Sequence, residues 1–229
     1  MRTVLSRLSR PGVIAGVLLL FGASSLGDAP DTRASTEEIA AYFVAHRSSV
    51  LVAVVLLGAA TIGVLGFAAS EWRRVNAEHG VAAAVAAGGA LIAVALIETG
   101  MVLPYATLAY VVGAEAPTSA KALFEVTLVT APIVSVPILV LIAGVAWAEF
   151  HRRRVSARFV VSVVAVVLLA AGPFSFAARG PFSPDVQQQV VFNTMILWLV
   201  VSELTRRRTD DEGDVKPPSS RSSVRQCST

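Results

Sequence analysis

The sequence predicts an all-α protein, a polytopic transmembrane bundle of about six helices. The 229 residues are 55% hydrophobic and only 15% charged, and the mean hydropathy of +0.68 lies outside the usual range of soluble domains. The apolar residues gather in stretches long enough to cross a hydrocarbon core of about 30 Å. The basic residues cluster between these stretches, as they do in membrane proteins.

Six apolar segments are candidate spans, and most match the roughly 17 to 25 residues that a spanning helix needs. They are residues 12–26, 50–69, 81–103, 123–147, 159–178 and 184–204. We end the third near Leu103, because Pro104 cannot donate the next helical hydrogen bond. The sixth begins with Ser183 as N-cap and Pro184 at the first helical position, which is a recognised start signal.

The distribution of lysine and arginine predicts the orientation, because cytoplasmic loops retain basic residues. An alternating six-span topology places fifteen of the nineteen basic residues on one side. The other side keeps Arg33, Arg47, Lys121 and Arg179. Both termini are therefore predicted to be cytoplasmic, with the arginine clusters beside anionic lipid headgroups.

The N-terminus allows a second interpretation. A basic start, an apolar run from Val13 to Phe21 and small residues at Ala23, Ser25 and Gly27 also describe a secretory signal peptide. Its cleavage would leave five spans. The small-residue pattern before Asp28 is loose, so we favour a retained first span over residues 1–27.

The segment from Asp28 to Ser49 is the longest predicted external loop. Ser35 followed by Glu38 predicts a capping box that opens a short amphipathic helix with Ile39, Tyr42 and Phe43 on it. We favour a capped helix that leads into the second span over a lid on a ligand site.

The C-terminal residues 205–229 are predicted to form a disordered cytoplasmic tail after the transmembrane bundle of residues 1–204. They are rich in charge, proline and serine, with almost nothing apolar to bury. Cys227, the only cysteine of the sequence, excludes an internal disulfide and a cysteine metal site.

Glu98 and Glu125 are the candidate site residues, because a carboxylate inside an apolar span is costly. Both lie toward the outer ends of consecutive predicted spans, which a short loop makes antiparallel neighbours. They could therefore share a proton, as a proton carrier or a cation ligand. A structural role, in which each is neutral or bonds a neighbour, is favoured. Glu71, Glu149 and Glu203 lie at helix ends beside basic residues and are interpreted as interfacial charges.

Small residues on the third span suggest close helix packing. Glu98 shares one helix face with Ala84, Ala87, Leu91 and Val94, where small side chains would let another helix approach. Small residues spaced by four also suit tight contacts, namely Ala59 with Gly63, and Ala82 with Ala86 and Ala90.

Two groups of residues interrupt the apolar spans. Prolines are interpreted as simple kinks rather than ion sites, namely Pro132, Pro137 and Pro173. Amides give the outer half of the sixth span a polar character, namely Gln187, Gln188, Gln189 and Asn193. These amides either wet a cavity or hydrogen-bond between helices, and the second use is commoner.

Signatures of common enzymes and cofactor sites are missing from the sequence. His46, His79 and His151 fall at span ends, so a two-histidine haem site is not expected. The sequence has no HExxH, no Gly-x-Ser-x-Gly and no phosphate-binding glycine loop. We predict no enzymatic activity, no metal, no cofactor and no nucleic-acid partner.

The segment from Ala34 to Arg47 carries a resemblance. With Ile39, Tyr42, His46 and Arg47 at matching positions, followed by apolar hairpins and basic inner loops, it resembles an uncharacterised actinobacterial family of multi-span integral membrane proteins of unknown function. The resemblance implies a multi-pass protein of the bacterial plasma membrane.

Three classes of function are open from the sequence. A structural or partner-binding membrane protein, whose partner is a second copy or another membrane protein, ranks first. A small transporter or proton- or cation-coupled carrier ranks second, because it should show an internal repeat and only a loose one is found. An intramembrane enzyme ranks last, because two glutamates make a thin polar constellation.

Overall fold

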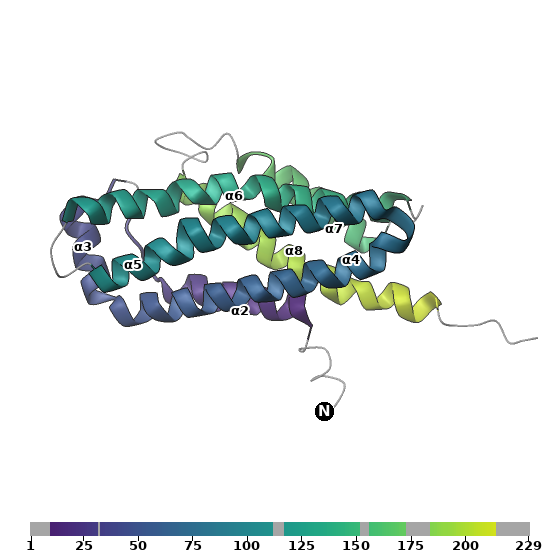
Figure 1. Ribbon diagram of the computed structural model, residues 1–229, viewed down its shortest axis with the longest axis horizontal. Helices are drawn as coiled ribbons and strands as arrows, with labels where there is room; N and C mark the ends of the chain where they lie inside the picture. Colours follow the sequence, from purple (N-terminus) through teal and green to yellow (C-terminus); the bar gives the residue numbers. More distant parts are fainter. Residues whose placement is uncertain (1–9, 32, 112–116, 152–155, 173–183, 214–229) are drawn as a thin grey trace, which may run out of the picture.

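The computed structural model describes residues 10–31, 33–111, 117–151, 156–172 and 184–213. Within these ranges the regular structure is helical and no strand occurs, so the predicted all-α class is confirmed. The elements are α2 (Pro11–Ser25), α3 (Thr36–Ala45), α4 (Arg47–Ile97), the π-helix η1 (Glu98–Val102), α5 (Leu103–Val111), α6 (Pro117–His151), α7 (Ala157–Leu169) and α8 (Pro184–Gly213). Figure 1 shows them as an elongated bundle whose long helices follow its long axis.

Helix α4 consists of two antiparallel arms. They are joined at His79, whose backbone is non-helical (φ −141°, ψ 61°), and Figure 1 shows the chain reversing direction here. Gly58 of the first arm faces Glu98 and Val102, which follow the second arm. The two arms thus contain the second and third predicted spans.

The helix of the third predicted span continues past Pro104, with the π-helix η1 just before this proline. The sequence predicted that regular structure would end near Leu103, and this was wrong, because α5 continues to Val111. Proline removes one backbone donor, and a wider π turn immediately before it accommodates the gap without ending the helix.

Helix α6 packs against the second arm of α4 through small residues. A Cβ on Gly89 would lie 2.6 Å from the backbone nitrogen of Leu141, and one on Gly144 would lie 2.9 Å from the Ala86 Cβ. Ala82, Ala86 and Ala90 are buried, as their spacing predicted. The sequence also predicted close helix packing on the face that Glu98 shares with Leu91. This was wrong, since Leu91 is 60% exposed. α6 is one helix across Pro132 and Pro137.

Helix α2 fills a place between the first arm of α4 and α8. Its Ala15 and Leu19 are fully buried, and a Cβ on Gly63 would lie 2.9 Å from the Ala15 Cβ. At the basic end of α2, the Arg10 side chain donates to the backbone carbonyl of Glu203 on α8 (2.8 Å). The first apolar segment therefore completes the core.

Helix α3 closes one end of the bundle, which we call the α3 end. The predicted capping box is present, since Ser35 Oγ accepts from the Glu38 amide (3.1 Å) and Glu38 Oε2 accepts from the Ser35 amide (2.7 Å). Ile39 and Phe43 are buried, and the Phe43 ring contacts those of Tyr105 and Phe124. Helix α3 thus covers the core at this end of the bundle.

The last two helices differ in length from their predicted spans. α7 ends at Leu169, where residues 159–178 were predicted, and Pro173 and Ser183 lie outside the described residues. α8 runs to Gly213, past the predicted start of the tail at residue 205, because adding a turn to a formed helix is easier than starting one. The Trp198 indole of α8 donates to Ser162 Oγ of α7 (3.0 Å).

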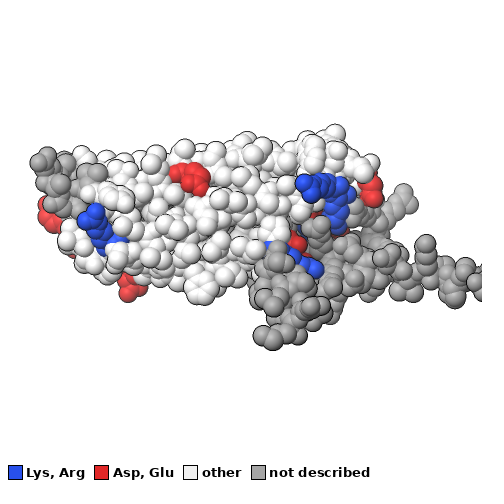
Figure 2. Space-filling model, turned by 60° about the horizontal axis from the view of Figure 1, so that its bottom comes forward, with Lys and Arg blue, Asp and Glu red and all other residues white. Residues whose placement is uncertain are grey.

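The flank of the bundle is apolar. Large side chains such as Val55, Ile62 and Val167 are about 70% exposed. Figure 2 shows most charged side chains toward the two ends, with a flank between them that is uncharged on this face except for one acidic patch. By length and composition, two helical stretches among the described residues could cross a membrane, Arg47–Tyr110 and Ser119–His151, while α2 and α7 are shorter apolar helices.

Candidate functional site

Glu98 is bonded across the α4 hairpin. It begins the π-helix, and its Oε1 accepts a hydrogen bond from Thr61 Oγ1 on the first arm (2.6 Å). Thr61 is 4% exposed and also lies 2.6 Å from the Gly58 carbonyl oxygen. Gly58 lies against the carboxyl group, since a Cβ there would be in van der Waals contact with Glu98 Oε1, at 3.8 Å. The contact joins the two arms.

Glu125 lies elsewhere. Its side chain is exposed on α6. Gly100 packs on Thr130, and the antiparallel register then puts Glu125 near the level of Tyr105. Seven residues of helical rise, about 10 Å, separate it along the axis from Glu98. The structure does not bring the two carboxylates together, because Glu98 faces the first arm of α4.

A buried ionic cluster lies at the basic end of the bundle, opposite α3. It joins Glu71 and Arg74 of α4, Glu149 of α6 and Arg158 of α7. Arg74 Nη2 lies 2.5 Å from Glu149 Oε1, and Arg158 Nη2 lies 2.9 Å from Glu71 Oε2. Glu71 and Arg158 are 2% and 3% exposed.

The capped start of α7 positions Arg158 in this cluster. Ser156 Oγ accepts from the Phe159 amide (3.1 Å), which starts the helix and puts Arg158 in its first turn. A cation there opposes the helix dipole, so Arg158 needs the two carboxylates near it. The two carboxylates and two guanidinium groups of the cluster balance in charge, so the cluster can hold α4, α6 and α7 together.

Glu71, Glu149 and Glu203, interpreted as interfacial charges beside basic residues, are all buried, and Glu71 and Glu149 pair with such residues. One sequence signal could have found the cluster. Glu71 and Arg74 are spaced as neighbours on a helix, and Glu149 and Arg158 flank the next inner loop at the same predicted depth. Opposite charges at one level of adjacent helices favour pairing over separate solvation.

A cavity of about 340 Å³ opens at the α3 end and is the candidate binding site. Its wall is formed by the segment from Leu26 to Pro30 and by residues of α4, η1, α5, α6 and α8. Its polar side chains are Asp28, Tyr105, Gln188, Gln189 and Asn193. We call it the α3-end cavity.

The amides of α8 divide their roles. Gln187 is buried, whereas Gln188, Gln189 and Asn193 line the cavity, so the first of the two predicted uses occurs in the structure. The Tyr105 side chain lines the cavity together with Gln188. The cavity therefore presents neutral groups that both donate and accept hydrogen bonds, beside one carboxylate.

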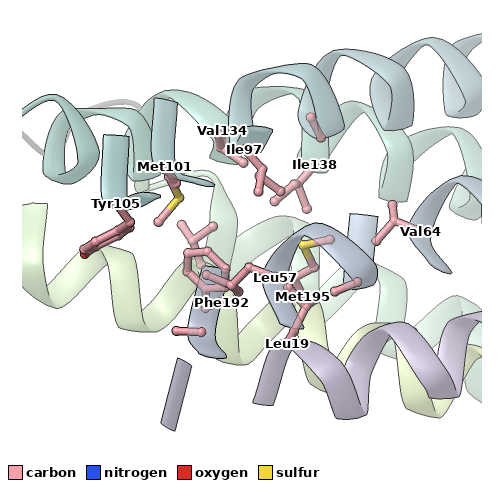
Figure 3. Close-up of a cluster of buried hydrophobic side chains, with 14 of the residues drawn as sticks. Leu19, Leu57, Val64, Ile97, Met101, Tyr105, Val134, Ile138, Phe192 and Met195 are labelled. Carbon is pink, nitrogen blue, oxygen red and sulfur yellow. The ribbon is translucent and has the colours of Figure 1, made fainter. Parts of the chain in front are cut away.

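The floor of the cavity is apolar. Figure 3 shows Leu57, Met101 and Phe192, from three elements, pointing toward one another. Toward the basic end the core continues through buried Val64, Ile97 and Ile138. Among the described residues, a polar pocket at one end is thus separated from the ionic cluster at the other by a layer of apolar side chains.

No group of three or more His, Cys, Asp and Glu residues that could hold a metal occurs in the described parts of the chain. Comparisons with protein families, curated proteins and solved structures found no match. The cavity and its chemistry therefore carry the functional argument.

Proposed function

We propose that this chain is a multi-span protein of a bacterial plasma membrane that acts by binding a ligand or partner in the α3-end cavity. The observation that carries the proposal is the cavity itself, with hydrogen-bonding groups at its mouth and an apolar floor. Sites with few convergent polar groups on apolar walls are typical of ligand binding.

Six crossings with both termini in the cytoplasm fit the bundle. The crossings would be α2, the two arms of α4 with η1 and α5, then α6, α7 and α8. The basic end, with Arg10, Arg73, Arg74 and Arg158, would face the cytoplasm by the excess of positive charge. Of these residues Arg73 is exposed and would contact anionic headgroups, and the cavity would open to the outside.

Cysteine accessibility tests the topology. In a Cys227→Ser background, Ala29→Cys should react with a membrane-impermeant maleimide in intact cells. Asn76→Cys, exposed at the α4 turn, should react only after permeabilisation. Labelling of both from the outside would overturn the alternating topology.

Ligand protection tests the binding role. Labelling of a cysteine at the cavity reports whether a ligand occupies it. Gln189 and Ala29 are exposed at the cavity, so Gln189→Cys is the first reporter and Ala29→Cys the second, whereas Tyr105 is buried and unsuitable. Compounds from a polar metabolite set that occupy the cavity should slow maleimide labelling of Gln189→Cys and leave the reactivity of Asn76→Cys unchanged. Equal rates throughout the set would count against a ligand site.

A proton- or cation-coupled carrier is the second candidate, and Glu98 favours it, because an ionisable group lies beside a π turn in the middle of the bundle. Reconstituted vesicles that hold a pH dye test it. Binding without transport predicts equal proton flux for the unmodified protein, Glu98→Gln and Glu125→Gln. A flux lost in Glu98→Gln alone would replace the binding proposal with a carrier.

A further inference from the structure

A groove on the flank lies next to the cavity. Between α7 and α8 a hollow of about 380 Å³ is lined by Val160, Val164, Leu168, Leu197 and Trp198, with Asn193 and Thr194 at one end. Its rim is exposed, Val164 by 53% and Leu197 by 63%, whereas Trp198 at its base is 1% exposed. The groove extends over the rise from Val160 to Leu168, about 12 Å.

Asn193 joins the groove to the cavity. It lines both, with Gln189 one helical turn before it toward the α3 end and Leu197 one turn after it. The cavity, which carries polar side chains, and the apolar groove thus share a wall residue, and the groove faces the flank. Hydrogen-bonding side chains in the cavity followed by an apolar groove match a molecule with a polar head and a hydrocarbon chain.

We infer that the cavity and the groove form one site for an amphiphile with an uncharged, polyhydroxylated head, such as a sugar on an alkyl chain. The inference rests on the proposed function and names its ligand class. The head occupies the α3-end cavity, and the chain passes Asn193 and lies in the groove between α7 and α8.

The chemistry of the lining selects the head. Gln188, Gln189 and Asn193 each offer donors and acceptors, and hydroxyl groups need both. Asp28 accepts further hydroxyl donors. The described residues that line the cavity include Asp28 and no lysine or arginine, so their side chains favour an uncharged head over a phosphate or carboxylate head.

Photolabelling in nanodiscs of phosphatidylcholine tests the inference on the full chain. The probe is an alkyl glucoside with a diazirine at the chain end, and its match is an alkyl phosphocholine with the same chain. We expect glucoside labelling of α7 and α8 peptides that unlabelled glucoside competes away, in a yield about tenfold above the phosphocholine probe.

Two variants locate the label. Val164→Trp fills the groove and should abolish saturable labelling, while Val126→Trp, on the exposed flank of α6, should leave it unchanged. Asn193→Leu should remove the preference for glucoside over phosphocholine. An unchanged size-exclusion profile shows that each variant folds, and Asn193→Leu tests the site even where Val164→Trp does not fold.

The outcomes separate this inference from the proposed function. Equal, unsaturable labelling by both probes overturns the amphiphile site. Protection of Gln189→Cys by free glucose without groove labelling also overturns it, yet supports a cavity that binds soluble sugars. The proposed function would instead be refuted if maleimide labelled both Ala29→Cys and Asn76→Cys from the outside. It would also be refuted if the protein carried a proton flux that Glu98→Gln removes.

Discussion

At the scale of single residues, Arg158 shows how this protein handles buried charge. Its guanidinium is 3% exposed and lies within 3.4 Å of a carboxylate on α4 and another on α6. A buried ion is costly unless its partners compensate it. The cluster therefore stabilises the bundle only while all members are present, and Arg74 alone cannot neutralise two acids.

Arg158→Met should destabilise the protein by about 3–5 kcal/mol, because it leaves Glu71 and Glu149 with one cation. Unfolding in mixed micelles with a denaturing detergent gives this free energy. Adding Glu71→Gln should recover part of the loss, since paired groups are not additive. Arg73→Met, an exposed neighbour, is the control. A loss no larger than that of Arg73→Met would mean that the cluster carries no stability.

Tyr42 ties α3 to the segment after α2, because its hydroxyl donates to the Leu26 carbonyl. Burial, with smaller effects of Tyr105 and Asp28, raises the pKa of Tyr42 from 10.0 to about 12. The neutral form is thus favoured in the folded state. Its stabilisation is complete below the unfolded value of 10 and is lost as the pH rises through 12.

Alkaline titration followed by tyrosinate absorbance should therefore show one phenol that ionises near pH 12 and disappears in Tyr42→Phe. The free energy of unfolding of the unmodified protein should fall between pH 10 and 12 more steeply than that of Tyr42→Phe. An identical pH dependence in both proteins would contradict the tie between α3 and Leu26.

Much of the residue-level chemistry could not be predicted from the sequence. Spacing showed that Gln188, Gln189 and Asn193 share the outer part of one helix, but the cavity they line needs Met101, Phe124 and the Leu26 to Pro30 segment as well. Glu98 was identified because charge in an apolar span is conspicuous. Its partner Thr61 was not, because a threonine in a long apolar helix has no distinguishing pattern.

At the scale of elements, the crossing of α4 and α6 depends on missing side chains. Gly89 and Gly144 let two backbones approach, and a Cβ on Gly89 would meet Leu141 N at 2.6 Å and Pro137 O at 2.7 Å. Close approach of this kind is how helices associate in lipid, where the hydrophobic effect contributes little.

Gly89→Ala should destabilise the protein by about 1–3 kcal/mol, because the new methyl group overlaps backbone atoms that cannot rotate away. Gly88→Ala is the matched control, since nothing lies within 4 Å of its Cβ position. There the higher helix propensity of alanine should leave stability unchanged or raise it by up to about 1 kcal/mol. Thermal unfolding of both variants in the same detergent distinguishes them, and equal melting temperatures would contradict the tight crossing.

Element boundaries followed from the sequence where local signals were strong. The capping box at Ser35 located the start of α3, and the apolar segment 123–147 predicted α6, although the helix extends beyond it at both ends, over Pro117–His151. Pro104 was misleading because its local rule says that a helix ends, whereas packing of α5 on α6 and a π turn keep the helix going. Tertiary contacts of this kind are invisible to periodicity.

At the scale of the whole molecule, α2 decides whether the bundle is complete. Its Ala15 and Leu19 are fully buried between α4 and α8, and Gly12 and Gly16 face Glu203 and Val200 of α8. A cleaved signal peptide would take this contact surface away and expose those faces of α4 and α8. The packing therefore favours retention of the first apolar helix, although a signal peptide also fits its sequence.

Intact mass spectrometry of the purified protein tests this directly. Retention predicts the mass of the full chain, 23.9 kDa, whereas cleavage before Asp28 predicts a protein that lacks residues 1–27. A variant that lacks residues 1–27 should melt at a lower temperature and aggregate, because the core faces that met Ala15 and Leu19 would contact solvent or lipid. Gly16→Leu, which would collide with Val200 on α8, should reproduce part of that loss, while Val17→Leu on the exposed side of α2 should not. A truncated native mass with unchanged stability would mean that five helices suffice for the bundle.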